Sequence, residues 1–253
     1  MKQIFFLLTL ISITFVVNAT PTKLIVRVKA KDAKFIGTGI GGAYIVIKNN
    51  LTGEVLAKGL TQGASGSTEL LMQSALGRKQ VLTDNKTAKF EASIDITEPL
   101  LVDVQATAPV AKRGAAINGT TQLWLIPGKN IEGDGLIIEL PGFVLDILNP
   151  TTHAFIQQAA IKEPLELKVS LTMLCGCTIT KGGVWDADSI EVAGYIKKDG
   201  IRTKDITLKL SKEANIFTTP LPASEKGTYQ VTVYAYDPRT GNTGVDNVNF
   251  VIQ

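Results

Sequence analysis

Leu165–Met173 reads LELKVSLTM, and in this stretch apolar and polar residues alternate without a break. Successive side chains of an extended strand point to opposite faces, so the apolar residues share one face and the polar residues share the other. The alternation therefore predicts a β-strand with one buried and one solvated face. Downstream runs of similar character predict strands at 190–197, 206–210, 227–236 and 245–252.

The first half of the chain follows the same pattern. Short apolar or β-branched runs predict strands at 24–29, 42–48, 54–57, 90–96, 100–106, 120–126 and 136–140, with turn-forming segments between them. One segment competes with this interpretation: Ser67–Leu76, followed by Gly77, fits a short helix with a glycine stop. The many short strands predict an all-β chain, and its 253 residues suit two β-sandwiches.

The first twenty residues have the pattern of a secretory signal peptide. Lys2 precedes the apolar run 4–17, and Val17-Asn18-Ala19 places small residues where a signal peptidase cleaves. This run is shorter than the roughly 20 apolar residues that a spanning helix needs, and no later run approaches that length. We therefore expect a mature chain without a transmembrane segment, located in the periplasm or outside the cell. The short signal and the sparse cysteines favour a bacterial source.

The domain boundary is predicted from a change in composition. Polar and turn-forming residues at Leu148–Thr152 interrupt apolar strands on both sides. The sequence thus predicts a signal peptide at 1–19, a first β-sandwich at 20–148 and a second β-sandwich at 149–253.

The charge composition bears on the kind of partner. The chain has 26 Lys and Arg against 23 Asp and Glu, a formal net charge of +3, and its basic residues are scattered rather than clustered. This distribution argues against a nucleic-acid groove or a polybasic membrane patch. We expect a protein or cell-surface partner instead.

Several segments of the first half carry a family resemblance. GAYIVI at 42–47, LTGEVLA at 51–57, GLTQG at 59–63 and the extended run at 100–108 resemble the transthyretin-like or carboxypeptidase-regulatory-like modules of secreted bacterial proteins. The resemblance implies a β-sandwich used for support or binding. It is a likeness of fold, because such modules share strand and turn patterns rather than catalytic residues.

A different likeness covers most of the second half. GTYQVTV at Gly227–Val233 resembles the penultimate strand of bacterial immunoglobulin-like domains, in which a tyrosine, here Tyr229, bonds back across a corner of the sandwich. Antibody-type domains place their second cysteine two residues later, where this chain has Val231. Their inter-sheet disulfide is therefore excluded, and Cys175 and Cys177 need another explanation.

Three interpretations of the two cysteines stay open. The first is a disulfide, which an exported chain can form. Two residues of regular strand span about 6.6 Å, near the upper limit for bridged Cα atoms, so a disulfide requires a kink at Gly176. The second is a copper or zinc site built from Cys175, Cys177, Met173 and the single histidine, His153. The third is two small side chains buried in the core.

The segment KGGVWDAD at Lys181–Asp188 is a second candidate for a site. Trp185 can serve as a stacking platform, with Asp186 and Asp188 as oxygen ligands of a cation. The structural alternative is that Trp185 packs near the next strand and the aspartates cap turns.

Sequence motifs for catalysis are missing. The chain has one histidine, and it has no nucleophile-elbow pattern, metalloprotease helix motif or phosphate-binding glycine motif. We therefore predict a non-enzyme without a cofactor: an exported binding or structural protein of two β-sandwich modules. The alternative is a periplasmic protein that handles copper or exchanges a disulfide through Cys175 and Cys177.

Overall fold

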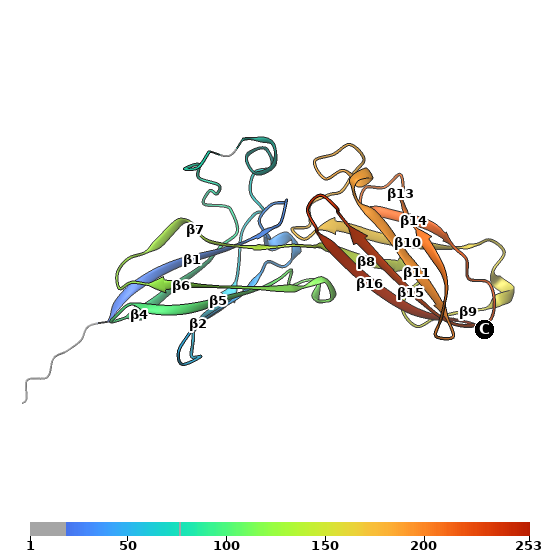
Figure 1. Ribbon diagram of the computed structural model, residues 1–253, viewed down its shortest axis with the longest axis horizontal. Helices are drawn as coiled ribbons and strands as arrows, with labels where there is room; N and C mark the ends of the chain where they lie inside the picture. The colour runs from blue at the N-terminus through green and yellow to red at the C-terminus, as the bar shows by residue number, and fades with distance from the viewer. Residues whose placement is uncertain (1–18, 76) are drawn as a thin grey trace, which may run out of the picture.

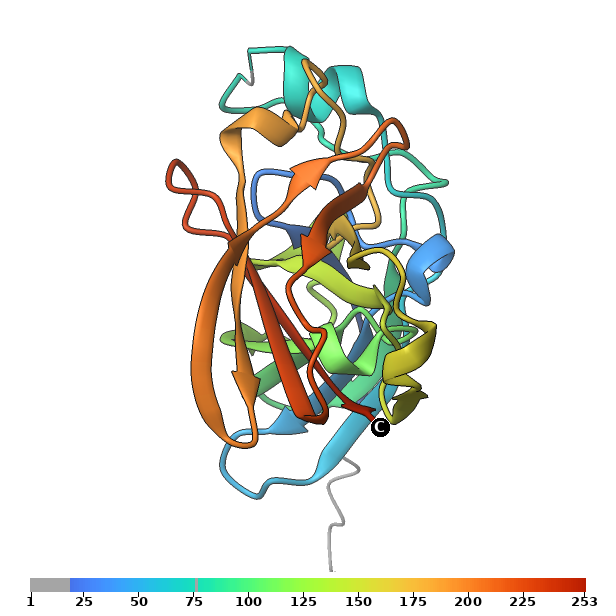
Figure 2. The same cartoon turned by 90° about the vertical axis from the view of Figure 1, so that its right-hand side faces the viewer.

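The computed structural model describes residues 19–75 and 77–253. The predicted signal peptide at 1–19 lies outside the described residues, apart from Ala19. The described chain is all-β and forms two domains that lie side by side along the long axis of the molecule (Figure 1). Figure 2 looks along that axis from the end of the second domain.

The first domain is a β-sandwich of two sheets. One sheet has the order β4-β1-β7 and the other β3-β2-β5-β6. Its strands are β1 (Thr20–Ala30), β2 (Tyr44–Asn49), β3 (Val55–Leu60), β4 (Phe90–Ile96), β5 (Leu100–Ala108), β6 (Ile117–Leu125) and β7 (Ile131–Leu140), with short helical turns η1 (Thr38–Ile40), η2 (Glu69–Gln73) and η3 (Arg113–Ala115). The π-helix η2 lies within the segment for which the sequence offered a short helix.

The core of this domain follows from the alternation in its strands. Leu24 and Val26 of β1, Ile45 of β2 and Val102 and Val104 of β5 are fully buried, and the residues between them point outward. β1 pairs antiparallel with β4 and parallel with β7.

The second domain has the strand order of an immunoglobulin-like domain. One sheet is β13-β14-β10-β8 and the other β12-β11-β15-β16-β9, which correspond to the ABED and GFC arrangements of that fold. Its strands are β8 (Phe143–Asn149), β9 (Ala154–Ile156), β10 (Leu165–Met173), β11 (Glu191–Lys198), β12 (Ile201–Thr207), β13 (Lys209–Leu210), β14 (Ile216–Leu221), β15 (Gly227–Tyr236) and β16 (Thr243–Ile252), with turns η4 (Gln158–Ala160) and η5 (Ala187–Ser189). The alternating stretch from which the fold class was predicted is β10, with the same bounds.

The predicted tyrosine corner is confirmed. Tyr229 is 3% exposed, its hydroxyl donates to the Glu225 carbonyl at 2.8 Å, and its ring stacks on Phe250. Val231, at the position of the missing cysteine, is fully buried. The corner is thus held by a hydrogen bond and apolar packing where antibody-type domains add a disulfide.

The strand pairing shows that the second domain begins earlier in the chain than the predicted boundary at 148/149. β8 runs through that boundary and pairs antiparallel with β10, so it belongs to the second sandwich. The turn-forming residues at Asn149-Pro150 connect β8 to β9 within that domain. The change of domain falls instead at Pro141-Gly142, between β7 and β8, where Gly142 has a φ of +130°.

Candidate functional site

Met173–Cys177 forms a tight turn at the end of β10. The Gly176 amide donates to the Met173 carbonyl at 2.7 Å, and the Met173 amide donates to the Cys177 carbonyl at 3.1 Å. Gly176 adopts a φ of +77°, which a residue without Cβ tolerates. The turn brings the Cα atoms of Cys175 and Cys177 to 5.4 Å, and the two residues form a disulfide. Of the three interpretations, the structure thus contains the disulfide with its kink at Gly176.

The four residues proposed as metal ligands are not brought together. Both cysteine sulfurs are used in the disulfide, and Met173 is 2% exposed in the core. The His153 amide donates to the Asn249 carbonyl of β16, whereas Met173 pairs with Phe143, which packs on Gly244 at the start of β16. Five residues of strand separate those two points of β16, about 17 Å. Among residues 19–75 and 77–253, no cluster of three or more His, Cys, Asp or Glu suits a metal ion.

Trp185 lies between the two domains. It is 9% exposed, and its indole N–H donates to the Asp32 carbonyl of the first domain at 2.8 Å. Its ring is therefore not a free stacking platform. Asp186 caps the turn η5: its carboxylate accepts from the amides of Gly182 at 2.8 Å and Asp188 at 3.2 Å, and these bonds hold the pKa of Asp186 below its ordinary value.

Asp188 lies at the surface. Its carboxylate is 3.6 Å from the ammonium of Lys181, and both side chains are mostly exposed. An exposed ion pair of this kind contributes little to stability. The segment predicted as a binding loop is thus folded around its own polar groups and joined to the first domain through Trp185.

The loop between β15 and β16 completes the joint between the domains. Asn242 is fully buried: its side-chain oxygen accepts from the Gly142 amide at 2.8 Å, and its side-chain amide donates to the Lys31 carbonyl at 3.0 Å. Arg239 of the same loop forms an ion pair with Asp32 at 2.5 Å, which raises the pKa of Arg239. We call the contacts of Asn242, Arg239 and Trp185 with the first domain the domain junction.

The disulfide turn borders this junction. A Cβ on Gly176 would lie 3.2 Å from Ile40 of η1, so the turn and the first domain approach closely. The buried apolar residues of the two domains form one continuous cluster. The sequence offered the Cys175–Cys177 and Trp185 segments as two candidate sites, and the structure makes both of them part of the contact between domains.

Two hollows lie beside the junction. One of about 350 Å³ is lined by Met72, Met173, Trp185 and Arg239 among others. The other, about 530 Å³, is open and lies between Ile40 of the first domain and the β8–β10 sheet of the second. At the first hollow Arg239 is shared by the carboxylates of Asp32 and Asp237, and the Asp186 carboxylate accepts from backbone amides. At the second, Lys112 pairs with Asp146.

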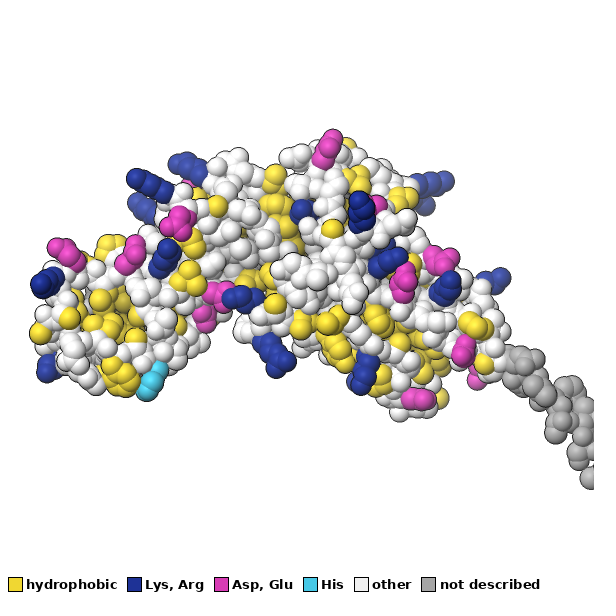
Figure 3. Space-filling model, turned by 180° about the vertical axis from the view of Figure 1, so that it is seen from behind, with side chains coloured by type: hydrophobic (Ala, Val, Ile, Leu, Met, Phe, Trp, Pro, Cys, Tyr) yellow, Lys and Arg dark blue, Asp and Glu magenta, His cyan; other side chains and the backbone are white. Residues whose placement is uncertain are grey.

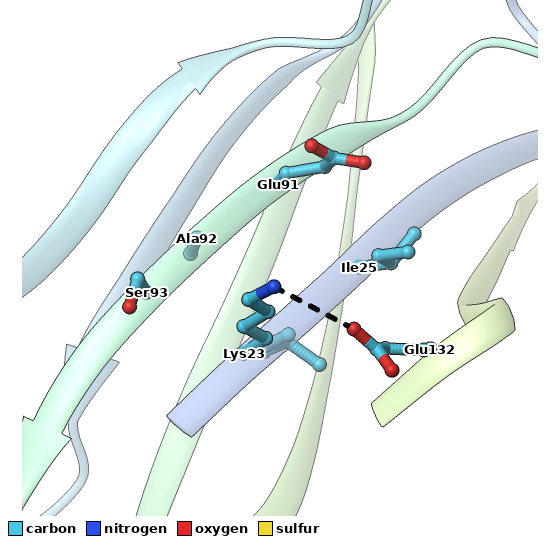
Figure 4. Close-up of a pocket in the computed structure, with 7 residues that line it drawn as sticks. Lys23, Ile25, Glu91, Ala92, Ser93 and Glu132 are labelled. Atoms are coloured by element: carbon cyan, nitrogen blue, oxygen red, sulfur yellow. Dashed lines mark ion pairs between the residues drawn. The ribbon is translucent and has the colours of Figure 1, made fainter. Parts of the chain in front are cut away.

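A third hollow of about 210 Å³ lies on the outer face of the β4-β1-β7 sheet (Figure 4). Lys23 and Glu132 face each other there at 4.0 Å, with side chains 64% and 54% exposed. Glu91 and Ser93 of β4 border the same hollow. The groups are solvated and loosely paired, which is a weak basis for orienting a ligand.

The five-stranded sheet of the second domain carries an aromatic surface that was not among the predicted site residues. Tyr234 and Tyr236 alternate outward on β15, with Tyr195 on β11 and Val245 on β16 beside them. Tyr236 is 39% and Val245 57% exposed. We call these four residues the tyrosine face. The signal was present in the sequence, because Tyr234 and Tyr236 stand in the polar phase of an alternating strand.

Polar contacts hold two of these rings in place. The Tyr234 hydroxyl donates to the Glu191 carboxylate at 2.7 Å, and this bond raises the pKa of Tyr234. The guanidinium of Arg202 lies over the ring of Tyr195, 4.4 Å from its centroid. The face is therefore a set of oriented rings rather than loose side chains.

Comparisons with known proteins give likeness of fold alone. No family model and no curated protein matches the chain. One similar solved structure is an engineered protein with 17% identity, which covers 51% of this chain and 24% of that chain at a TM-score of 0.33. Fibronectin(III)-like modules of Clostridium thermocellum CbhA have 12% identity and cover 83% of this chain and 77% of that chain at a TM-score of 0.27. The titin domains Z1Z2 in complex with telethonin have 13% identity and cover 93% of this chain and 98% of that chain at a TM-score of 0.25. The chain thus spans 24% of the length of the engineered protein. Our assignment of the fold depends on the strand order rather than on these likenesses.

Among the described residues, no helix has the length and apolar character needed to cross a membrane.

Proposed function

We propose that this chain is an exported, non-catalytic binding protein in which two β-sandwiches are held in a fixed arrangement and a partner protein docks on the tyrosine face. The observation that carries the proposal is the gathering of three of the five tyrosines on the outer side of one sheet. Tyrosine and arginine are enriched at the centres of protein interfaces. A tyrosine ring buries a large area with few rotatable bonds.

The domain junction supports the part of the proposal that the two β-sandwiches are held in a fixed arrangement. A linker that let the domains move freely would not need a fully buried asparagine of the second domain bonded both to the linker, at Gly142, and to the first domain, at Lys31. Fixing the domains before binding lowers the entropy lost when a partner engages them. The Cys175–Cys177 disulfide fits export, since disulfides persist in oxidising compartments.

The experiment compares capture of partners from the surface and periplasmic fraction of the source cell. The baits are the wild-type chain expressed from residue 20, a Tyr234→Ala/Tyr236→Ala variant, and a Leu51→Ala control that removes a 91% exposed apolar side chain from the first domain. We expect one saturable partner whose affinity falls about 30-fold or more in the tyrosine variant and stays unchanged in the control. Equal capture by all three baits contradicts the proposal.

A second candidate function is thiol–disulfide exchange by Cys175 and Cys177. A related form of this candidate is the binding of a soft metal ion by the two cysteines once they are reduced. The observation that favours it is the disulfide itself. In the exchange, a partner dithiol is oxidised to a disulfide while Cys175–Cys177 takes up two electrons and two protons. Alkylation and intact mass before and after mild reduction, with metal analysis of the reduced protein, test this candidate. Resistance of the disulfide to a dithiol reductant in the folded protein, together with no copper or zinc uptake, excludes it.

A further inference from the structure

We propose that the outer face of the β3-β2-β5-β6 sheet binds an uncharged saccharide chain, with Trp124 as its stacking platform. This surface belongs to the first domain and is independent of the tyrosine face. We call Trp124, Leu101, Gln122, Asp103 and Asn50 the Trp124 cluster.

Trp124 is the exposed member of the two tryptophans. It is 61% exposed, whereas Trp185 is 9% exposed. The next residue, Leu125, is fully buried and fixes the phase of β6, so the indole points away from the core. Trp124 lies opposite Leu101 of β5, which leaves a flat apolar surface at this end of the sheet. An exposed indole of this kind commonly marks a binding surface.

Polar groups with fixed orientation lie next to that platform. The carboxylate of Asp103 accepts from the Asn50 side-chain amide at 3.0 and 3.1 Å and from the Gln122 side-chain amide at 2.7 Å. Asp103 and Gln122 form the cross-strand pair two residues along from Leu101 and Trp124, about 7 Å away. No residue of the described chain donates a hydrogen bond to the side-chain carbonyls of Asn50 and Gln122, and the Gln122 amide makes one of its two possible donations. Sugar hydroxyls both donate and accept hydrogen bonds, so each group has a complementary partner on a saccharide.

The charge of the face favours an uncharged ligand. The exposed residues of β6 are Asn118, Thr120, Gln122 and Trp124, none of which is charged. Acidic and basic side chains elsewhere on the molecule are interspersed, as the side seen in Figure 3 shows. On the neighbouring strands the same face carries Lys48, opposite Asp103, and Lys58, opposite Val46. Two lysines beside a carboxylate are far fewer than the basic groups that a nucleic acid or an acidic polymer requires.

The shape of the face favours a chain over a small molecule or a globular protein. From the Leu101–Trp124 pair to Thr107, six residues along β5, the sheet extends about 20 Å. Tyr44, 38% exposed and opposite Thr107, provides a second ring at that end. The stretch between the two rings is polar, whereas the centre of a protein interface is apolar. An extended saccharide can stack at both ends and form hydrogen bonds between them.

The test is affinity electrophoresis of the chain expressed from residue 20 in native gels containing mixed-linkage β-glucan, arabinoxylan, galactomannan or dextran, with dextran sulfate as the charged control. We expect retardation by at least one of the four uncharged polymers. Trp124→Ala should weaken that retardation about tenfold or more, while Leu51→Ala and Tyr236→Ala retain it. Circular dichroism checks that the variants are folded. Because Trp185 is buried, binding should also shift the tryptophan fluorescence through Trp124.

Four outcomes overturn the inference. These are no retardation by any uncharged polymer, equal retardation of Trp124→Ala and wild type, retardation by dextran sulfate alone, and a protein partner that is lost in Trp124→Ala without polysaccharide binding. The tyrosine variant used for the partner protein leaves Trp124 intact, so this inference and the proposed function can fail separately.

Discussion

Asn242→Ala should be the most damaging single polar substitution in the loop between β15 and β16. The asparagine is fully buried, and it serves the Gly142 amide of the linker and the Lys31 carbonyl of the first domain at the same time. Alanine removes both hydrogen bonds and leaves both backbone groups without that partner, the Gly142 amide in a buried site and the Lys31 carbonyl in a partly buried one.

The magnitude follows from the burial of the two groups. An unsatisfied buried donor or acceptor costs about 1–3 kcal/mol. The bond to Gly142 is buried and the bond to Lys31 is partly buried, so we take about 2 kcal/mol for the first and about 1 kcal/mol for the second. The free energy of unfolding should therefore fall by about 3 kcal/mol.

The assay is urea unfolding followed by tryptophan fluorescence. Trp185 lies at the junction, so its emission reports this region. Asn247→Ala is the matched control: Asn247 is an exposed asparagine on β16, and its loss should cost less than about 0.5 kcal/mol. Small-angle scattering should show a broader distribution of shapes for Asn242→Ala alone. If the two variants unfold within about 0.5 kcal/mol of each other, the junction does not depend on Asn242 and our account of it is wrong.

Three further predictions concern single sites. The buried guanidinium of Arg27 donates to the Thr87 and Ala88 carbonyls. Arg27→Met should therefore speed hydrogen exchange in residues 61–89 and lower the free energy of unfolding by about 1–3 kcal/mol. Unchanged exchange would contradict this. Cys175→Ser/Cys177→Ser should lower stability in thermal melts by only about 1–2 kcal/mol, since the bridge closes a loop with a sequence separation of 2; a loss above about 4 kcal/mol would disprove the estimate. The lowered pKa of Asp186 stabilises the fold above the ordinary value of 3.8, and this contribution is lost as pH falls through the folded pKa. Asp186→Asn should therefore lower the urea midpoint at pH 7 and converge with wild type in strong acid, and a constant difference at all pH values would argue against it.

The fold could be predicted where a local pattern determines it. The alternation in Leu165–Met173 gave β10 with its observed bounds, and the GTYQVTV stretch gave the corner of Tyr229. β8 was missed because its residues FVLDILN carry no clean alternation, and four of its seven side chains are buried. The boundary was misplaced for the same reason, since the turn at Asn149-Pro150 has a stronger local signal than the two-residue turn at Pro141-Gly142.

The candidate site depended on contacts that no local pattern contains. Sequence singled out Trp185 for its neighbouring aspartates, yet the loop folds so that its indole reaches Asp32, far away in the chain. Trp124 lies inside a predicted strand and was not among the predicted site residues. Its alternation with Gln122 and Thr120 was the available signal, because a tryptophan in the polar phase of a half-buried strand must point to solvent. The cysteine pair stayed ambiguous because the answer depends on the φ of Gly176.

The domain junction fixes how the tyrosine face and the Trp124 cluster are placed relative to each other. The tyrosine face lies on the second domain and the Trp124 cluster on the first, so the angle between them is set by Asn242, Arg239 and Trp185. When two weak sites are held at a fixed separation, binding at one raises the effective concentration at the other, and a flexible joint loses part of that gain. A buried asparagine with all its hydrogen bonds made stabilises one arrangement of the domains, because any other arrangement leaves buried polar groups unpaired at a cost in free energy. The buried polar contacts therefore favour a protein whose function requires both surfaces to be presented together.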